Sequence, residues 1–186
     1  MKKELDLVTG WLLTASEAVP REYFQLPVAG SERPEYRERV YCYELYHRWR
    51  CQWPPGFLFS LGGEINKRGH PLIRGDEQPD FLVHVPGQMY NLLIVEVKPV
   101  NAEPARMAAD LKKLTRFRRE LYDQDGLRAS YEAAYFWLYG VPLRSWPSLR
   151  ERLLAAVAGS DDFDPDLVSC FVHEQAAARA VPVVWR

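Results

Sequence analysis

Two carboxylates and an amine flank two β-rich runs near the middle of the chain. Asp80 comes just before the run 81–85, and Glu96 and Lys98 lie near the end of the more apolar run 91–98. Because side chains alternate along a strand, Glu96 and Lys98 share one face of the second run. Carboxylate oxygens are the ligands that Mg²⁺ and Mn²⁺ prefer. These residue types therefore indicate a divalent-metal site with an amine beside it.

The two runs are predicted to form a β-hairpin, because a Pro-Gly pair breaks the sequence between them. The register gives three opposed pairs: Val85–Asn91, Leu82–Ile94 and Asp80–Glu96. Opposed side chains point to the same face, with Cβ atoms roughly 5 Å apart. Two carboxylates so placed repel each other unless a cation lies between them. A one-residue slip would turn Asp80 to the other face.

A simpler interpretation makes Glu96 and Lys98 an ion pair on a solvated strand face. The run that carries them is otherwise densely apolar, as expected for a strand buried on both faces. Charged groups are seldom buried without a paired or functional role. The pattern therefore favours a functional site.

The spacing of these residues resembles that of a known family. Pro79-Asp80 and Glu96-Val97-Lys98 are similar to the two half-motifs of the PD-(D/E)XK nucleases, which have the restriction-endonuclease-like fold. The resemblance covers roughly residues 35–140. It implies an α/β protein with three α/β/α layers, a central mixed sheet and an α-β-β-β-α-β core. It also implies a metal-dependent nuclease that hydrolyses phosphodiester bonds in DNA.

The same resemblance implies a role for each motif residue. Asp80 and Glu96 would hold Mg²⁺ or Mn²⁺, which polarises the phosphate and lowers the pKa of a bound water. Lys98 would either stabilise the developing negative charge or, with a lowered pKa, help to deprotonate the attacking water. Cutting both strands of a duplex would require a homodimer or a partner subunit.

A further carboxylate is expected from the helix predicted over residues 35–50, since the family's first helix often supplies one. Periodicity places Glu38 within the apolar stripe of this helix. The local pattern around Glu44 instead looks like the family's first-helix signature, although Glu44 could simply pair with Arg48 one turn later. On the resemblance, Glu44 is the predicted third metal ligand and Glu38 the alternative.

A strand predicted over residues 57–66 adds a third alternative, Glu64, and leads into a basic turn. Lys67 in this turn is expected to contact phosphates of the substrate, or else to be an ordinary charged hairpin tip.

The helix predicted over residues 101–122 carries two further candidates for substrate contact. Arg106 and Lys113 flank its apolar side, where the resemblance places the substrate backbone. A strand over residues 131–139 follows, and strand–helix–strand succession predicts a parallel crossover.

Composition predicts one domain over residues 1–186. The chain has 186 residues, of which 47% are hydrophobic, enough for a substantial core. That core is expected over about 35–140, with an N-terminal segment, 1–34, wrapped around it. Residues 141–186 are predicted to add a helix, 149–157, and short strands, 167–172 and 181–185.

Net charge and cysteine spacing limit the function classes. A formal net charge of −1 gives no overall argument for nucleic-acid binding, so any such site must be local. The three cysteines lack metal-binding spacing, and reduced thiols in a cytoplasmic protein are expected. No membrane span is predicted. The alternatives to a nuclease are a catalytically idle module that binds nucleic acid or a protein partner, and an unrelated α/β domain with a chance motif.

Overall fold

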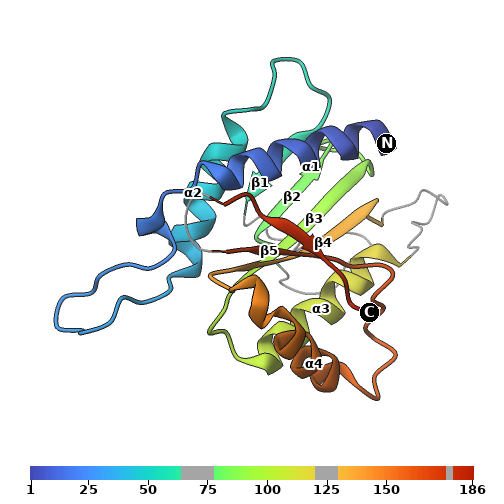
Figure 1. Cartoon of the computed structure of the whole chain (residues 1–186). Helices are drawn as coiled ribbons and strands as arrows, with labels where there is room; N and C mark the ends of the chain where they lie inside the picture. Colours follow the sequence, from blue (N-terminus) through green and yellow to red (C-terminus); the bar gives the residue numbers. More distant parts are fainter. Residues whose placement is uncertain (64–77, 120–129, 175–177) are drawn as a thin grey trace.

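A mixed β-sheet forms the centre of the structure (Figure 1). The computed structural model describes residues 1–63, 78–119, 130–174 and 178–186. Within these residues the six strands of the sheet follow one another in chain order. They are β1 (Ser60–Gly63), β2 (Phe81–His84), β3 (Asn91–Pro99), β4 (Ala133–Tyr139), β5 (Ser169–His173) and β6 (Val181–Val183). The central strands β3, β4 and β5 are parallel, and the outer pairs are antiparallel.

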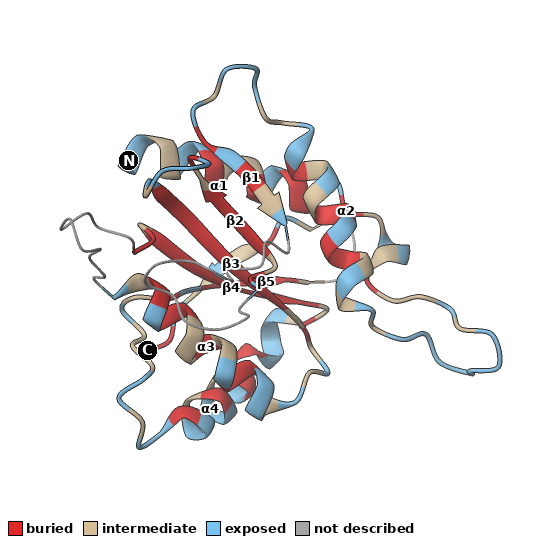
Figure 2. Ribbon diagram, turned by 180° about the vertical axis from the view of Figure 1, so that it is seen from behind, coloured by how far each residue is buried: buried red, intermediate tan, exposed pale blue. Residues whose placement is uncertain are grey.

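Helices cover both faces of this sheet, which gives three layers (Figures 1 and 2). Their bounds are α1 (Lys2–Glu17), α2 (Glu38–Arg50), α3 (Pro104–Arg118) and α4 (Trp146–Val157), with two short 3-10 turns, η1 (Arg21–Tyr23) and η2 (Leu143–Ser145). The crossovers β3-α3-β4 and β4-α4-β5 step in the same direction. Because such crossovers are right-handed, they place α3 and α4 on one face. The N-terminal helices α1 and α2 pack on the other face.

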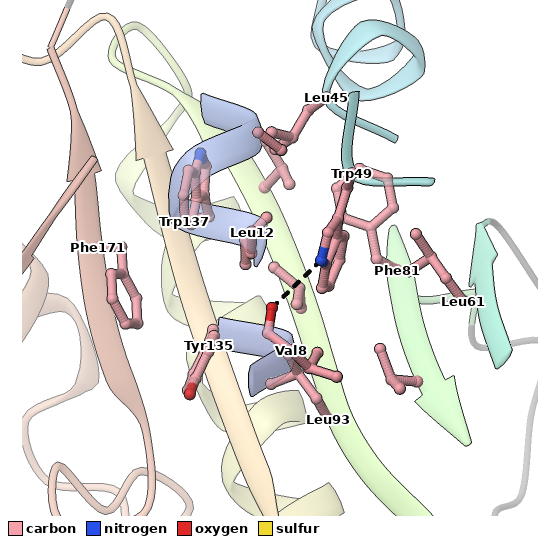
Figure 3. Packing of buried hydrophobic residues seen from close by; sticks show 14 of the residues in the cluster. Val8, Leu12, Leu45, Trp49, Leu61, Phe81, Leu93, Tyr135, Trp137 and Phe171 are labelled. Atoms are coloured by element: carbon pink, nitrogen blue, oxygen red, sulfur yellow. Dashed lines mark hydrogen bonds between the residues drawn. The ribbon is translucent and has the colours of Figure 1, made fainter. Parts of the chain in front are cut away.

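Each face has its own apolar core, because almost every residue of β3 and β4 is buried. On the α1–α2 side, Leu12 and Trp49 pack against Leu93 and Trp137, and the Trp49 indole donates a hydrogen bond to the Val8 carbonyl at 3.3 Å (Figure 3). On the α3–α4 side the core includes residues from both helices and the alternate strand positions, among them Ile94, Leu111, Phe136 and Leu153. The alternation of side chains along each strand divides them between the two cores.

The predicted hairpin is present, with one irregularity. Leu82 pairs with Ile94, as the sequence predicts, and the same register continues to the pair Phe81–Val95. The prediction that Val85 pairs with Asn91 is wrong, because the register shifts between Val83 and His84 and it is His84 that pairs with Asn91. The irregularity lies near the turn, so the register toward the Asp80 end of the hairpin is unaffected by it.

Most predicted elements are present with shifted ends. The helix predicted over 35–50 begins at Glu38, because residues 26 and 35 form an isolated antiparallel bridge before it. The chain between η1 and α2 loops out from the body at this bridge (Figure 1). The helix predicted over 101–122 runs from Pro104 to Arg118. Of the strand predicted over 57–66, residues 60–63 form β1, and residues from 64 onward lie outside the described part of the chain.

The parallel crossover predicted after the hairpin is confirmed by the pairing of β3 with β4. Cys42, Cys51 and Cys170 are free thiols, the first and last of them buried. None of the helices in the described ranges combines the length and the apolar character needed to cross a bilayer.

Candidate functional site

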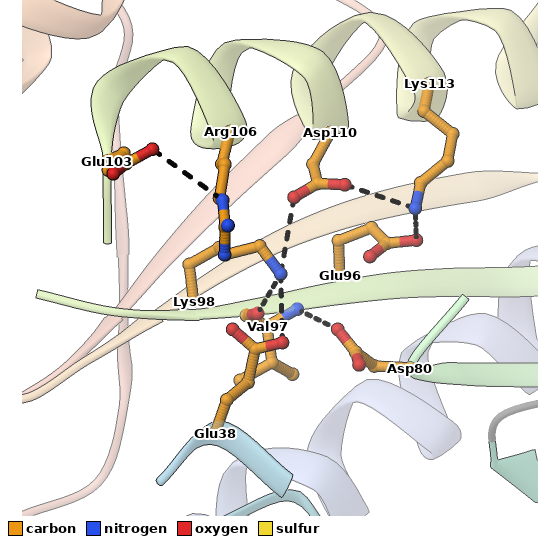
Figure 4. Close-up of polar contacts among 9 residues, drawn as sticks. All are labelled: Glu38, Asp80, Glu96, Val97, Lys98, Glu103, Arg106, Asp110 and Lys113. Atoms are coloured by element: carbon orange, nitrogen blue, oxygen red, sulfur yellow. Dashed lines mark hydrogen bonds and ion pairs between the residues drawn. The ribbon is translucent and has the colours of Figure 1, made fainter. Parts of the chain in front are cut away.

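Four carboxylates and two lysines from four parts of the chain lie around β3, some of them between β3 and α3 and others on the side of α2 (Figure 4). We call this group the acidic cluster. Its members are Glu38 at the start of α2, Asp80 just before β2, Glu96 and Lys98 on β3, and Asp110 and Lys113 on α3. The alternation along β3 directs Glu96 and Lys98 toward α3, where the helical spacing of Asp110 and Lys113 places both over the strand.

Lys98 lies between carboxylates from two helices. Its ammonium donates hydrogen bonds to Oε1 of Glu38 at 3.1 Å and to the Val97 carbonyl at 3.0 Å, and it lies 3.3 Å from Oδ2 of Asp110. Burial alone would lower the pKa of Lys98, but the charges of Asp110, Asp80 and Glu38 outweigh it and raise that pKa. Lys98 is therefore a held, protonated amine in this arrangement.

Lys113 occupies the other side of the cluster. Its ammonium lies 2.6 Å from Oε1 of Glu96 and 3.1 Å from Oδ1 of Asp110. Burial opposes the charge of Lys113, yet the two carboxylates raise its pKa overall. Lys113 was predicted to contact the substrate backbone, and the structure places its amine against the acids of the cluster.

Asp80 is fixed by the backbone of the neighbouring strand. Its Oδ2 accepts a hydrogen bond from the Val97 amide at 2.7 Å, so the side chain takes the place of a strand carbonyl just before β2 begins. Burial raises the pKa of Asp80 to about 6, although Lys98 and the Val97 amide act in the opposite direction. The Asp80 carboxyl group is therefore held in place, and it binds a proton at a higher pH than an ordinary aspartate does.

Glu96 is almost inaccessible to solvent, with 2% of its surface exposed. Burial raises its pKa well above the ordinary value, and the charge of Asp80 raises it further, against the effect of Lys113. The negative charge of Asp80 therefore disfavours ionisation of Glu96, as one carboxylate does to another nearby. A cation between them would relieve that repulsion.

The donor chemistry of the cluster suits a hard divalent cation. Its potential ligands are all carboxylate oxygens, which Mg²⁺ and Mn²⁺ prefer over Cys and His ligands. With all groups ionised, four carboxylates face two ammonium groups, which leaves two excess negative charges. Within residues 1–63, 78–119, 130–174 and 178–186, however, no three His, Cys, Asp or Glu side chains are grouped so that they could hold a metal ion. Lys113 now binds Glu96, one of the acids that a metal would use.

The structure favours Glu38 over Glu44 as the acid supplied by α2. Glu38 contacts Lys98 in the cluster. Glu44 instead accepts a hydrogen bond from Nε of Arg48 at 2.6 Å, one turn along the same helix. This is the simple pairing that the sequence left open for Glu44. The hydrophobic periodicity of α2 therefore indicated the acid that reaches the cluster, Glu38, whereas the local sequence pattern pointed to Glu44, which does not reach it.

Of the remaining predicted residues, only Arg106 lies in the described part of the chain, and it does not join the cluster. Arg106 lies on the first turn of α3, highly exposed, with Nε 3.7 Å from Oε2 of Glu103. Lys67 and Glu64 lie outside the described residues.

Sequence reasoning missed Asp110, which contacts both lysines. The signal that could have found it is its position on α3. Asp110 falls between Met107 and Leu114 at helical spacing, on the side that packs against the sheet. An acid within an apolar stripe is also what distinguishes Glu38 on α2.

Comparison with known proteins adds no relative: no family model, no curated protein and no solved structure matches this chain.

Proposed function

We propose that the acidic cluster is the active site of a metal-dependent nuclease of the PD-(D/E)XK type, acting on DNA. The observation that carries the proposal is the proximity of two carboxylates, the half-buried Asp80 and the buried Glu96, beside a lysine held by two further acids. A site of this composition suits phosphodiester hydrolysis, which needs a water nucleophile and positive groups that stabilise the negative charge developing on the phosphoryl oxygens.

In this proposal Asp80 and Glu96 hold Mg²⁺ or Mn²⁺ once Lys113 moves away from Glu96. The ion would supply a water of lowered pKa and would offset negative charge on the phosphoryl oxygens. The Val97 amide keeps Asp80 in position from the neighbouring strand.

Lys98 would stabilise the charge that develops on the phosphoryl group. Its raised pKa favours the protonated form over a general base. Glu38, Asp110 and the Val97 carbonyl orient the amine before the substrate arrives, so little reorganisation is needed during the reaction.

The proposal is tested by incubating the full chain with plasmid, linear single-stranded DNA and RNA, with Mg²⁺, Mn²⁺ or EDTA. Cleavage of DNA is expected with either metal and not with EDTA. Lys98→Ala is expected to lower the rate about a hundredfold, the usual effect of losing one charge-stabilising donor. Cleavage that persists in EDTA, or at an unchanged rate in Lys98→Ala, would contradict the mechanism.

Paired amide substitutions decide which acid of α2 belongs to the site. Glu38→Gln is expected to lower the rate because it removes one of the acids that hold Lys98. Glu44→Gln makes the same change to an acid that pairs with Arg48, and is expected to leave the rate unchanged. The opposite result would favour Glu44 as the metal ligand.

A second candidate function is a binding module whose site is idle. The observation that favours it is the ion pair at 2.6 Å between Lys113 and Glu96, which already offsets the charge of the acid most needed for a metal. Isothermal titration with Mn²⁺ on the wild type and Asp80→Asn distinguishes the two. Metal binding that needs Asp80, without turnover of any nucleic acid, would favour the binding module.

A further inference from the structure

A hollow opens directly beside the acidic cluster, on the side of α2. Its volume is about 310 Å³, and it is lined by Cys42, Tyr43, Tyr46, Gly63, Asp80 and Phe81. Asp80 belongs to both the hollow and the cluster. Whatever binds in the hollow therefore lies next to the proposed reaction site.

Aromatic rings form the walls of this hollow. Tyr46 and Phe81 have centroids 6.3 Å apart and planes inclined by 26°, and the Tyr46 hydroxyl donates to the Leu61 carbonyl at 3.3 Å. That hydrogen bond ties the Tyr46 ring to β1. Tyr43 is 59% exposed, which leaves its ring available to a ligand.

A glycine keeps the hollow open. A Cβ added at Gly63 would lie 3.6 Å from the Tyr46 ring and 3.6 Å from the Asp80 carbonyl, which is ordinary contact. An alanine would fit there, but a longer side chain would extend into the space between Tyr46 and Asp80. The strand at this position does not require a glycine for its conformation, since no positive φ occurs at Gly63.

We propose that the hollow binds one unpaired nucleobase of the strand whose phosphodiester lies at the acidic cluster. The volume and the aromatic walls suit a flat ring that stacks on tyrosine. A base within a duplex has both faces covered by its neighbours and cannot enter unless it leaves the stack. The inference, which rests on the proposed function, makes the substrate single-stranded or locally unpaired DNA.

The test measures base stacking independently of cleavage. Thymidine oligonucleotides that carry one 2-aminopurine, moved along the strand position by position, are titrated with the Glu96→Gln variant in Mg²⁺. Stacking on an aromatic side chain quenches 2-aminopurine fluorescence, so one position is expected to be quenched most strongly. The same oligonucleotides annealed to a complement are expected to bind more weakly.

Three further substitutions in the Glu96→Gln background examine the walls. Tyr43→Ala is expected to weaken binding about tenfold and to remove the quenching, as loss of one base–aromatic stack does. Tyr43→Phe keeps the ring and is expected to keep both. Gly63→Leu fills the hollow and is expected to abolish quenching while both tyrosines remain.

Tyr90→Ala is the matched control, because Tyr90 is similarly exposed, at 56%, and lies at the other end of β3, in the loop before Asn91. It is expected to change neither affinity nor quenching. Circular dichroism of each variant verifies that the chain is folded.

The outcomes separate this inference from the nuclease proposal. Quenching that Tyr43→Ala and Gly63→Leu remove supports the hollow as a base site, even if the wild type cleaves nothing. Equal quenching in all variants, no quenching at any position, or equal binding of duplex would overturn it, even if the wild type is an active nuclease.

Discussion

At the scale of single residues, the lysines of the acidic cluster compete with any cation for the same carboxylates. Lys113 is the clearest case, since its ammonium lies 2.6 Å from the buried Glu96. Lys113→Gln removes that positive charge and is expected to tighten Mn²⁺ binding about tenfold. Isothermal titration measures the change directly.

Lys112→Gln is the control for this substitution. Lys112 is the preceding residue on α3, and its ammonium lies 3.9 Å from Asp162, outside the cluster. Its substitution is expected to leave Mn²⁺ affinity unchanged. If Lys113→Gln left the Mn²⁺ affinity unchanged or weakened it, the proposal that the Lys113 amine competes with the metal for Glu96 would be contradicted.

A second residue-scale feature is a buried histidine on the α1–α2 side of the sheet. The Tyr41 hydroxyl accepts a hydrogen bond from the Trp137 indole at 2.8 Å and lies 2.6 Å from Nδ1 of His173. Because the indole can only donate, the hydroxyl is free to donate its own proton to Nδ1. Burial favours the neutral form of His173, and the contacts of Tyr41 with Trp137 and His173 join α2 to β4 and β5.

Burial lowers the pKa of His173 to about 4, from 6.5. Between these values the unfolded chain binds the proton and the folded chain does not, so stability falls as the pH falls through this window. The shift corresponds to a loss of about 3 kcal/mol in the free energy of unfolding. Urea denaturation at a series of pH values measures it.

Substitution separates this histidine from other titrating groups. His173→Gln cannot take up a proton, so its stability should depend less steeply on pH between about 6 and 4. His47→Gln changes an exposed histidine and should keep the wild-type dependence. Identical pH dependence in His173→Gln and the wild type would contradict the assignment.

The sequence predicted part of the cluster, and the reason is local. Asp80, Glu96 and Lys98 are related by strand alternation and one hairpin register, both of which are visible in the sequence. Glu38 and Asp110 reach the cluster from helices whose approach depends on packing across the sheet. Only their positions within apolar stripes indicate that they face inward.

At the scale of elements, the joint between β4 and α2 depends on a single glycine. Gly140 has a φ of +74°, and a Cβ added there would lie 2.5 Å from a ring carbon of Tyr36. Tyr36 packs on Tyr139 and immediately precedes Arg37, the residue before α2. The contact therefore helps to position Glu38, the first residue of α2.

Gly140→Ala is expected to lower the free energy of unfolding by about 3 kcal/mol, from backbone strain together with the displaced ring. Gly30→Ala is the matched control, because Gly30 has a φ of +80° and an open surrounding. Gly30→Ala should lower the free energy of unfolding by about 1 kcal/mol, because it introduces backbone strain without displacing a neighbouring ring. Urea denaturation compares the two, and equal losses would show that Tyr36 does not crowd this site.

Element types were easier to predict than element ends. The apolar run of β3 and the helical stripes of α2 and α3 were visible in the sequence and are confirmed. The register shift at His84 was not visible in the sequence. It changes the pairing near the hairpin turn, and no residue of a distinctive type marks its position. The start of α2 was misplaced because residue 35 pairs with residue 26 instead of entering the helix.

At the scale of the whole molecule, the topology joins the two cores through one sheet. Residues of β3 alternate between the α1–α2 core and the α3–α4 core, so neither helix layer has a face to pack on without the strand. The acidic cluster lies where the two layers approach the same strand, with Glu38 from one and Asp110 from the other. Separation of the layers would therefore dismantle the site.

This arrangement predicts that the chain unfolds in one cooperative step. Leu12→Ala on one face and Leu111→Ala on the other each remove a fully buried side chain and should cost about 3 kcal/mol. Both should shift the same transition, with coincident curves from far-ultraviolet circular dichroism and tryptophan fluorescence. Leu58→Ala, at a position 66% exposed, should cost less than about 0.5 kcal/mol. Two separate transitions, each sensitive to only one of the buried leucines, would mean that the layers fold independently and that the cluster forms at a joint between two units.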